Sequence, residues 1–345
     1  MVADVAIVGA GPAGAALAIE LGRRGVRVNL YEKAHAPRLK ACGEGILPHG
    51  VAALRAIAGD LPDAPRVRGL RFVVHGAAVE ADFPEGYGLV VRRDRLHAWL
   101  FDRAGALGDV DLRIGTPYVP SGERFVVGAD GTTSMFHRRL PAHRPVERRV
   151  GLSTHMAGID GVTDQVEVFF HPLGEIYLAP AGEGEALVAA LVYQRTFRRD
   201  ALTFLLRDIP ELRARTSHIE MTTPLLASSP LGLSVPNVVD GDLLLIGDAA
   251  GAPDPITGDG MAMAFASVKP AADAVVDGDL TRYQRERRAL GRTSERLGRL
   301  LLRMARVHGP AARTLLGRPS LVPTLLDVAI ARRPLNAATL LRAVL

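Results

Sequence analysis

The 345-residue sequence predicts an α/β fold with a parallel-sheet lobe, a second β-sheet lobe and a helical C-terminal region. Three observations lead to this prediction. A buried-strand pattern, a glycine-rich turn and a helix pattern follow one another at the N-terminus. Two later segments alternate apolar and polar residues with the period of a β-strand. From Leu280 onward the apolar residues recur with helical spacing.

The first unit is a strand–turn–helix–strand pattern. Residues 2–10 (VADVAIVGA) are a β-branched apolar run, typical of a buried parallel strand. A helix follows and ends at Gly25, and a second strand ends at Glu32. The glycines between them have G-x-G-x-x-G spacing. We therefore predict a cofactor site formed by Gly9, Gly11, Pro12, Ala13, Gly14, Glu32 and Lys33.

The spacing of this turn has a chemical reason. Gly9 permits the tight turn, Gly11 lets the backbone approach a pyrophosphate, and Gly14 lets the helix pack on the strand. The helix N-terminus then faces two negative charges. Glu32 accepts hydrogen bonds from a ribose and disfavours a 2′-phosphate, so FAD or NAD is expected rather than NADP.

Two more turns follow apolar strands. Residues 125–128 (FVVG) precede Ala129-Asp130-Gly131, and residues 243–246 (LLLI) precede Gly247-Asp248. With three such turns in this order, the chain resembles the FAD-dependent oxidoreductases of the para-hydroxybenzoate hydroxylase fold. That family includes aromatic hydroxylases, flavin-dependent halogenases and geranylgeranyl reductases. The resemblance covers roughly residues 1–280.

The resemblance implies a domain organisation and a cofactor. A Rossmann-like FAD-binding lobe, of the second glutathione-reductase type, is expected from residues 1–63, 92–145 and 236–279. A β-sheet substrate lobe is expected from residues 64–91 and 146–235, followed by a helical region at 280–345. The resemblance also implies tightly but non-covalently bound FAD, which a transient NAD(P)H reduces.

The resemblance further assigns roles to single residues. Arg93 is expected at the phosphate–ribityl region, Asp130 in the second turn, and Gly247 and Asp248 at the ribityl chain. Pro255 is expected near the isoalloxazine face. The flavin pyrimidine edge is expected to meet backbone N–H groups of Gly258, Asp259, Gly260 and Met261.

The segment KACGEGILPHG, residues 40–50, is expected to run along the flavin. Its glycines let the backbone pass close to a flat ring, and Pro48 is suited to the first turn of a helix. Lys40, Cys42 and Gly43 are therefore candidate cofactor contacts. The Lys-x-Cys-Gly pattern resembles the geranylgeranyl reductase branch, which makes Cys42 a candidate catalytic residue beside His49. A small buried thiol and a polar helix start are the alternatives for these two.

The resemblance also implies that the two segments with strand-like alternation, residues 67–91 and 149–193, form a sheet that covers the flavin. Candidate substrate-lining residues are His155, Phe169, His171 and Tyr177, and Tyr177 is also a catalytic candidate because it lies where the reductase branch has tryptophan. Ordinary sheet packing is the alternative for each. Aromatic residues make up only 5% of the chain, so an aliphatic pocket for an apolar small molecule is expected. The histidines lack metal-ligand spacing, and no metal site is predicted.

The reaction type has three candidates. The first is a monooxygenase that hydroxylates or epoxidises an apolar molecule through a flavin C4a-hydroperoxide with NAD(P)H. The second is a reductase or dehydrogenase of carbon–carbon bonds, similar to the geranylgeranyl reductases, in which Cys42 assists. The third is a flavin-binding interaction protein without catalysis. Only the second reaction continues without oxygen.

Charge is unevenly distributed. From Leu280 to the C-terminus there are fourteen arginines and three acidic residues, although the whole chain carries only +5. Arginines from Arg282 to Arg306 recur every three or four residues, which places them on one helix face. Either nearby acids neutralise this face, or it docks an acidic partner, such as a carrier protein holding the substrate, or anionic lipid.

Composition also indicates the cellular location of the protein and the partners it is expected to have. A single cysteine excludes an intrachain disulfide, and a cytoplasmic location is therefore expected. Because of the arginine face, peripheral attachment to a membrane is the alternative. No apolar run reaches the roughly 18 residues of a transmembrane helix. No zinc-finger spacing or aromatic RNA-binding pattern appears, so nucleic acid is not an expected partner.

Overall fold

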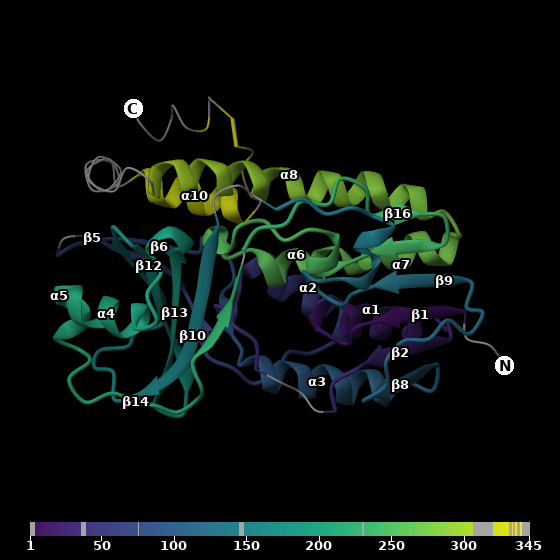
Figure 1. Ribbon diagram of the computed structural model, residues 1–345, viewed down its shortest axis with the longest axis horizontal. Helices are drawn as coiled ribbons and strands as arrows, with labels where there is room; N and C mark the ends of the chain where they lie inside the picture. Colours follow the sequence, from purple (N-terminus) through teal and green to yellow (C-terminus); the bar gives the residue numbers. More distant parts are fainter. Residues whose placement is uncertain are drawn as a thin grey trace.

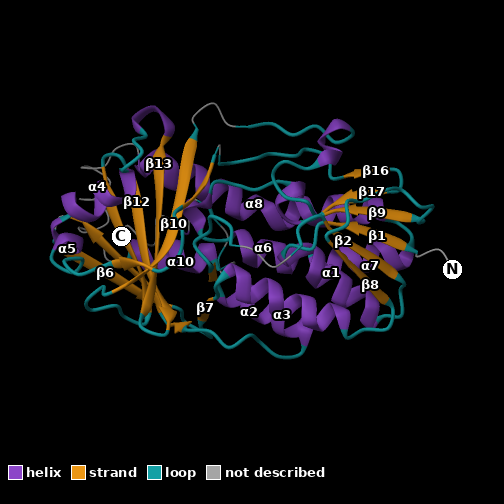
Figure 2. Ribbon diagram, turned by 60° about the horizontal axis from the view of Figure 1, so that its bottom comes forward, coloured by secondary structure: helices purple, strands orange, loops and turns teal. Residues whose placement is uncertain are grey.

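The computed structural model describes residues 4–35, 39–74, 76–144, 148–229, 231–305 and 320–330, together with 333, 335, 336 and 339. Two β-sheets lie at opposite ends of an elongated molecule, with helices between them (Figure 2). Helix α8 runs along one side past both sheets (Figure 1). This arrangement confirms the predicted α/β fold with a second sheet lobe and C-terminal helices.

The first sheet contains the predicted N-terminal unit. In spatial order its strands are β16 (Val239–Asp240), β17 (Leu243–Leu245), β9 (Phe125–Gly128), β1 (Val5–Val8), β2 (Val28–Glu32) and β8 (Val110–Ile114). All neighbours pair in parallel except β16 and β17. The three glycine turns follow β1, β9 and β17, so they share one edge of the sheet.

Helices cover this sheet and connect it to the rest of the chain. They are α1 (Pro12–Arg23), α2 (Pro48–Ala58), α3 (Arg93–Gly105), α6 (Gly260–Ala266) and α7 (Val268–Asp277). Helix α1 contacts each of the other four. Val5, Leu17, Leu30 and Leu244 are fully buried in the resulting core, which explains the continuous apolar runs of these strands.

The second sheet is largely antiparallel. Its order is β14 (Glu220–Met221), β10 (Arg149–Ala157), β13 (Glu185–Tyr193), β12 (Gly174–Gly182), β11 (Gln165–His171), β5 (Gly69–Val74) and β6 (Ala77–Asp82), with β15 (Leu226–Ser228) also paired to β10. Strands β5 and β11 are parallel. A small sheet of β3 (Gly45–Ile46), β7 (Gly88–Val90) and β4 (Arg66–Val67) also forms.

Short helices complete the described chain. Helices α4 (Ala201–Asp208) and α5 (Pro210–Arg213) belong to the second lobe, and the 3₁₀ turns are η1 (Met135–Arg138), η2 (Gln194–Thr196), η3 (Gly247–Ala250) and η4 (Pro255–Thr257). The C-terminal helices are α8 (Leu280–Ala305) and α10 (Leu321–Ala329). Leu297 of α8 packs with Leu321, Leu325 and Val328. In the described part of the chain, no helix combines the length and apolarity of a membrane span.

The second sheet has two different faces. Phe169 of β11 is 1% exposed and packs into a core with Leu202, Leu205 and Leu206 of α4. His171 lies on the same face of β11, with its Nε2 2.9 Å from Oδ2 of Asp208. The expectation that both residues line a substrate site is therefore wrong: alternation along a strand gives two faces, and theirs packs on helices.

Replacing Phe169 with alanine tests this assignment. We expect a loss of about 3–5 kcal/mol in the free energy of unfolding, because a large buried ring is removed from a packed core. Urea unfolding measures the loss. Phe170→Ala is the matched control, since Phe170 lies on the other face and is only partly buried. An equal or larger loss for the control would contradict the assignment.

Candidate functional site

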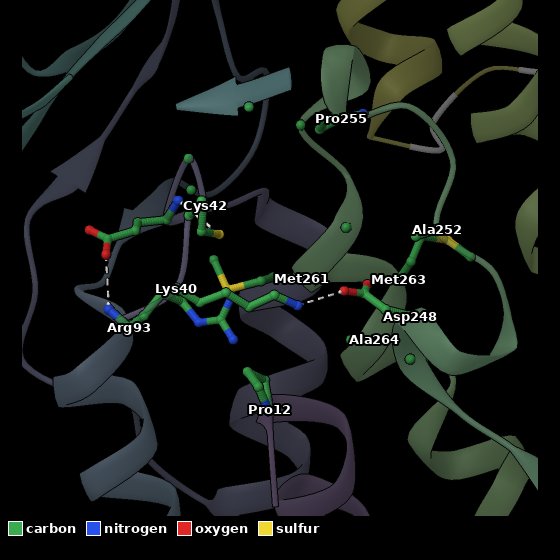
Figure 3. Close-up of a pocket in the computed structure, with 18 of the residues that line it drawn as sticks. Pro12, Lys40, Cys42, Arg93, Asp248, Ala252, Pro255, Met261, Met263 and Ala264 are labelled. Carbon is green, nitrogen blue, oxygen red and sulfur yellow. Dashed lines mark hydrogen bonds and ion pairs between the residues drawn. The ribbon is translucent and has the colours of Figure 1, made fainter. Parts of the chain in front are cut away.

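One large cavity of about 720 Å³ runs between the two sheets. This volume lies within the roughly 300–1,000 Å³ typical of ligand sites. Its wall begins at the three glycine turns, passes the segment around Cys42, and reaches the second sheet and helices α8 and α10. Figure 3 shows Cys42, Arg93, Asp248 and Met261 drawn around it.

The first two turns pack directly on each other. Gly9 has φ of 103°, and a Cβ at Gly9 would lie 2.6 Å from the carbonyl oxygen of Ala129. A Cβ at Gly14 would lie 2.0 Å from the carbonyl oxygen of Gly9. By contrast, a Cβ at Gly11 meets no protein atom within 4 Å, and Gly11 lines the cavity. Gly14 is therefore needed for packing, whereas Gly11 leaves space for a ligand.

The end of β2 presents a carboxylate to the same space. Glu32 accepts hydrogen bonds from the backbone N–H groups of Ala10, at 3.2 Å, and Ala34, at 2.9 Å. These two bonds fix the carboxylate beside the glycine turn. Glu32, Lys33, Pro12 and Ala13 line the cavity.

Two buried polar atoms along this wall have no hydrogen-bond partner among the described residues: Nε of Arg93 and Oδ1 of Asp130. The other groups of these side chains are held, since Arg93 Nη2 lies 3.2 Å from His97 Nε2 and Asp130 Oδ2 accepts from Met135 N–H at 2.8 Å. Buried polar groups normally have partners, so a polar ligand is expected here. The residues present fit FAD, because the glycine turn suits a pyrophosphate and the two unpartnered atoms suit a polar ligand.

Lys40 and Asp248 join the Cys42 segment to the third turn. Lys40 Nζ lies 3.3 Å from Asp248 Oδ2, and both side chains are partly exposed (Figure 3). Gly247, at φ of 61°, forms the bend that precedes Asp248. Lys40, Gly43, Gly247 and Asp248 all line the cavity.

Two hydrogen bonds hold Cys42, one to strand β10 and one within its own segment. Its backbone N–H donates to Ser153 Oγ at 3.2 Å, and its Sγ accepts from the backbone N–H of Glu44 at 3.3 Å. Glu44 has φ of 52°, in the left-handed region that non-glycine residues rarely adopt. Cys42 and Glu44 both line the cavity.

His155 does not line the cavity but holds a residue that does. Its Nε2 lies 2.8 Å from Oε2 of Glu44, and its Nδ1 lies 3.1 Å from Oγ1 of Thr223. His155 and Glu44 are 3% and 2% exposed. His155 was expected to line the substrate site, but it lies behind Glu44, and it is Glu44 that lines the cavity.

A second buried cluster surrounds Arg149, which is 2% exposed. Its guanidinium pairs with Glu175 of β12 and, at 2.7 Å, with Asp254. Burial alone would lower the pKa of Arg149, but Glu175 and Asp254 outweigh it and raise that pKa. Burial also raises the pKa of Glu175, which Arg149 opposes.

Tyr177 connects this cluster to the cavity that it lines. Its hydroxyl donates to Glu175 Oε1 at 3.4 Å. Burial and the carboxylate of Glu175 hold the pKa of Tyr177 well above its ordinary value of 10.0. Tyr177 therefore keeps its proton through neutral and mildly alkaline pH.

The segment from Asp254 to Met261 forms the opposite wall. The Asp254 carboxylate accepts from Ile256 N–H at 3.0 Å and so caps η4, which starts at Pro255. Pro255, Gly258, Gly260 and Met261 line the cavity. Asp259 instead turns to His49, with its Oδ1 2.9 Å from Nε2. His49 lies outside the cavity lining, which places it in a supporting contact between α2 and the start of α6 rather than at the reacting atoms.

Several residues of the site escaped the sequence-based assignment. Arg149, Glu175 and Asp254 were not identified in the sequence analysis. Arg149 and Glu175 are charged residues within apolar strands, and such residues are usually buried only as ion pairs, so this pattern could have predicted their pairing. The apolar wall of β11 is the face of Val166, Val168 and Phe170, opposite the one chosen. Helices α8 and α10 add an unforeseen apolar wall of Leu297, Leu301, Val322, Leu325, Leu326 and Ala329.

Comparison with known proteins agrees with this site. The family model of the FAD binding domain matches residues 2–57. A menaquinone reductase of Mycobacterium tuberculosis is 32% identical over 320 residues, covering 81% of this chain and 78% of the relative. A digeranylgeranylglycerophospholipid reductase of Methanopyrus kandleri is 29% identical over 325 residues, covering 81% of each chain.

Solved structures share the fold at lower identity. The flavin-dependent brominase Bmp2 has a TM-score of 0.80 at 17% identity, covering 95% of this chain and 93% of its own. PqsL of Pseudomonas aeruginosa, a probable FAD-dependent monooxygenase, has a TM-score of 0.72 at 20% identity, covering 90% and 98%. At this identity the likeness extends to the fold alone.

Alanine at Gly14 and at Gly11 should have separable effects. Gly14→Ala forces the first turn apart, so we expect the flavin-free protein to lose about 1–3 kcal/mol of unfolding free energy and to bind FAD weakly. Gly11→Ala is the matched control: it should leave the flavin-free protein as stable as wild type but weaken FAD binding. Urea unfolding and FAD fluorescence titration measure these effects. Unchanged stability of Gly14→Ala would contradict the packing role.

Proposed function

Because the chain belongs to the family of FAD-dependent oxidoreductases that includes menaquinone and geranylgeranyl reductases, we propose that it reduces a carbon–carbon double bond in the polyprenyl chain of a lipid. The relatives named above are reductases of menaquinone and of a digeranylgeranyl lipid, and the chemistry that these two substrates share is an unsaturated prenyl chain. The observation that carries the proposal is the apolar half of the cavity.

That half of the cavity suits a hydrocarbon chain. Aliphatic side chains reach it from both sides: Val166, Val168, Leu187 and Leu191 from the second sheet, and Leu297, Leu301, Val322, Leu325 and Leu326 from α8 and α10. Burying apolar surface contributes about 25 cal/mol per Å², without any requirement for specific polar contacts. Two polar side chains also line the cavity: Tyr177, which lies beside Val168 as its partner on the neighbouring strand, and Asp254, from the segment that precedes η4.

The cofactor residues and the wall residues have separate tasks. Bound FAD, reduced by a nicotinamide, would supply the hydride for the double bond. Glu32, Arg93, Asp130 and Asp248 would hold and orient it. Cys42 and Tyr177 both line the cavity and both carry a proton, and we propose that Cys42 gives the proton that accompanies the hydride, because the hydroxyl of Tyr177 already donates to Glu175. The surrounding aliphatic residues exclude water.

Oxygen transfer is the competing reaction, and it was the first expectation from the sequence. Its support is limited to the fold, because the brominase and the probable monooxygenase named above are only 17% and 20% identical to the chain. The reductase reading rests on relatives of up to 32% identity over most of the chain. The two reactions differ in their need for oxygen and in the mass of the product.

Incubation with a geranylgeranyl lipid that carries no quinone ring, under strictly anaerobic conditions, separates them. With FAD and NAD(P)H supplied, we expect the product to gain the mass of two hydrogens, located in the prenyl chain by fragmentation in mass spectrometry. The same lipid with fully saturated chains is the matched control and should be unchanged. Turnover only in air, with a product one oxygen atom heavier, would overturn the proposal in favour of a monooxygenase.

Because the proposed substrate is a lipid, the protein needs access to a membrane. We therefore also propose that the arginine face of α8 binds an anionic lipid surface. Arg285, Arg292, Arg296, Arg299 and Arg303 are exposed and make no ion pair within the described residues. At about 100° per residue they fall within about 60° of the helix circumference. Leu297 and Leu301, on the other side of α8, line the cavity. Arg306 lies outside the described residues.

The triple variant Arg292→Ser, Arg296→Ser, Arg299→Ser tests this surface. We expect wild-type protein to sediment with vesicles containing anionic phospholipid, and the variant to do so at least tenfold more weakly, because each arginine contributes about 1 kcal/mol near such a surface. Arg198→Ser, in an exposed pair with Asp200 on the other lobe, is the control. Equal sedimentation of the triple variant, or equal binding to uncharged vesicles, would contradict the assignment.

A further inference from the structure

We infer that Arg287 of α8 binds a phosphate group on the prenyl substrate, which makes Arg287 a residue that selects phosphate-bearing lipids. The inference deepens the proposed function and rests on it for the identity of the chain. Arg287 is only 8% exposed, it lines the cavity, and it makes no ion pair with any residue that the structure describes.

The other buried arginines show how unusual this is. Among the described residues, three arginines are buried: Arg93, Arg149 and Arg287. Arg149 does not line the cavity, and two carboxylates pair with it. Arg93 and Arg287 do line the cavity, and the guanidinium of neither pairs with a described carboxylate. A buried guanidinium keeps its charge and is rarely left without an opposite one, so an anionic ligand is expected at both.

The two cavity arginines belong to different sites. Arg93 begins α3, and α3 and α8 lie on opposite sides of the molecule, with α6 and α1 between them (Figure 1). Nη2 of Arg287 donates to the carbonyl oxygen of Gly251 at 3.1 Å, just past the third glycine turn. This bond fixes the guanidinium at the wall, and in the described part of the chain no other acceptor holds it. Its remaining N–H groups are therefore free for a ligand.

Neither nearby carboxylate neutralises Arg287. Asp254 lines the same cavity, but it pairs with Arg149 at 2.7 Å and accepts from Ile256 N–H at 3.0 Å. Glu295, about two turns further along α8, is exposed and forms no ion pair with Arg287. The buried charge thus has no counter-charge among the described residues, which is unfavourable unless a ligand supplies one.

Helix α8 keeps this cation apart from the arginine face. At about 100° per residue, Arg287 points about 120–180° away from the five exposed arginines. Leu297 and Leu301 lie within about 80° of Arg287 and about 15 and 21 Å further along the helix axis. Both leucines line the same cavity. A charged group at Arg287 therefore leaves the hydrocarbon chain to lie along the aliphatic wall, so one side of α8 serves both ends of the lipid.

Phosphate is the anion that fits both the arginine and the chain. A guanidinium binds carboxylate and phosphate oxygens alike through parallel hydrogen bonds. On a prenyl alcohol, the group that supplies such oxygens is a phosphate ester. FAD and nicotinamide dinucleotides carry phosphate as well, and separate titrations distinguish them from the lipid.

Equilibrium binding to oxidised, FAD-loaded protein tests the site, with no nicotinamide present so that no turnover occurs. Geranylgeranyl phosphate and geranylgeraniol have the same chain and differ only in the charged group. By calorimetric titration in a neutral detergent, we expect wild-type protein to bind the phosphate at least about tenfold more tightly, because its hydrogen bonds to Arg287 are charge-assisted. Equal affinity for the two lipids would overturn the inference.

Arg287→Gln keeps a donor for the Gly251 carbonyl oxygen but removes the charge, and its preference for the phosphate should fall to within about twofold. Arg288→Gln is the matched control: Arg288 is the next residue of α8, is exposed, and donates to the carbonyl oxygen of Pro236 at 3.0 Å. It should keep the wild-type preference. An undiminished preference in Arg287→Gln, or an equal loss in Arg288→Gln, would contradict the assignment.

If Arg287→Gln does not fold, chemical modification of the wild-type protein replaces it. Phenylglyoxal modifies arginines, and peptide mass spectrometry follows Arg287 alone. Geranylgeranyl phosphate should slow this modification far more than geranylgeraniol does. Equal protection by the two lipids would overturn the inference.

Two further titrations identify the source of the phosphate. Arg287→Gln should bind FAD and NAD(P)H as wild type does. A weakened affinity for either one, with the lipid preference intact, would assign Arg287 to that dinucleotide and overturn the inference.

Failure of the site and failure of the proposed function remain distinguishable, because binding requires no reduction. A protein that prefers the phosphate through Arg287 but reduces no prenyl chain under anaerobic conditions keeps the site and loses the proposed function. A protein that reduces the geranylgeranyl lipid but shows no such preference loses the site alone.

Discussion

The rest of the structure depends on one constraint: the backbone of the first glycine turn packs closely against the second turn and against the start of α1. Strand β1 pairs in parallel with β9, so the turns at Gly9 and Ala129 meet, and α1 crosses them at Gly14. Side chains at Gly9 or Gly14 would overlap backbone atoms. Only this packing points the start of α1 into the cavity and brings the third turn, after β17, beside the other two. The binding site for FAD follows from backbone geometry before any side chain contributes.

Strand β10 joins this frame to the substrate side. Alternate residues of one face contact both flavin-facing segments: Arg149 pairs with Asp254, Ser153 accepts from the backbone of Cys42, and His155 pairs with Glu44. Buried charges of this kind add little to stability, because the loss of hydration offsets their attraction. They do restrict geometry, since each needs one partner at one distance. A single strand thereby sets the spacing between the Cys42 segment, the Asp254 segment and the apolar wall.

Local patterns in the sequence were sufficient to predict the fold and the cofactor. The G-x-G-x-x-G turn, Asp130-Gly131 and Gly247-Asp248 each require particular backbone conformations, so they are readable without tertiary information. Phe169 and His171 show where such reading ends: alternation identifies the two faces of β11 but does not state which one meets α4. Arg149, Glu175 and Asp254 are far apart along the chain, and only the tertiary fold brings them together: β10 and β12 lie on either side of β13, and Asp254 comes from the segment before η4.

The central claim is that flavin held by these turns passes its electrons to an unsaturated hydrocarbon chain lying between Cys42 and the aliphatic wall. Flavin absorbance in a sealed anaerobic cuvette tests it most directly. FAD-loaded protein reduced by one equivalent of nicotinamide should regain its oxidised spectrum when a geranylgeranyl lipid without a quinone ring is added, and should stay reduced with the fully saturated analogue of that lipid. A spectrum that recovers only when air is admitted would contradict the account.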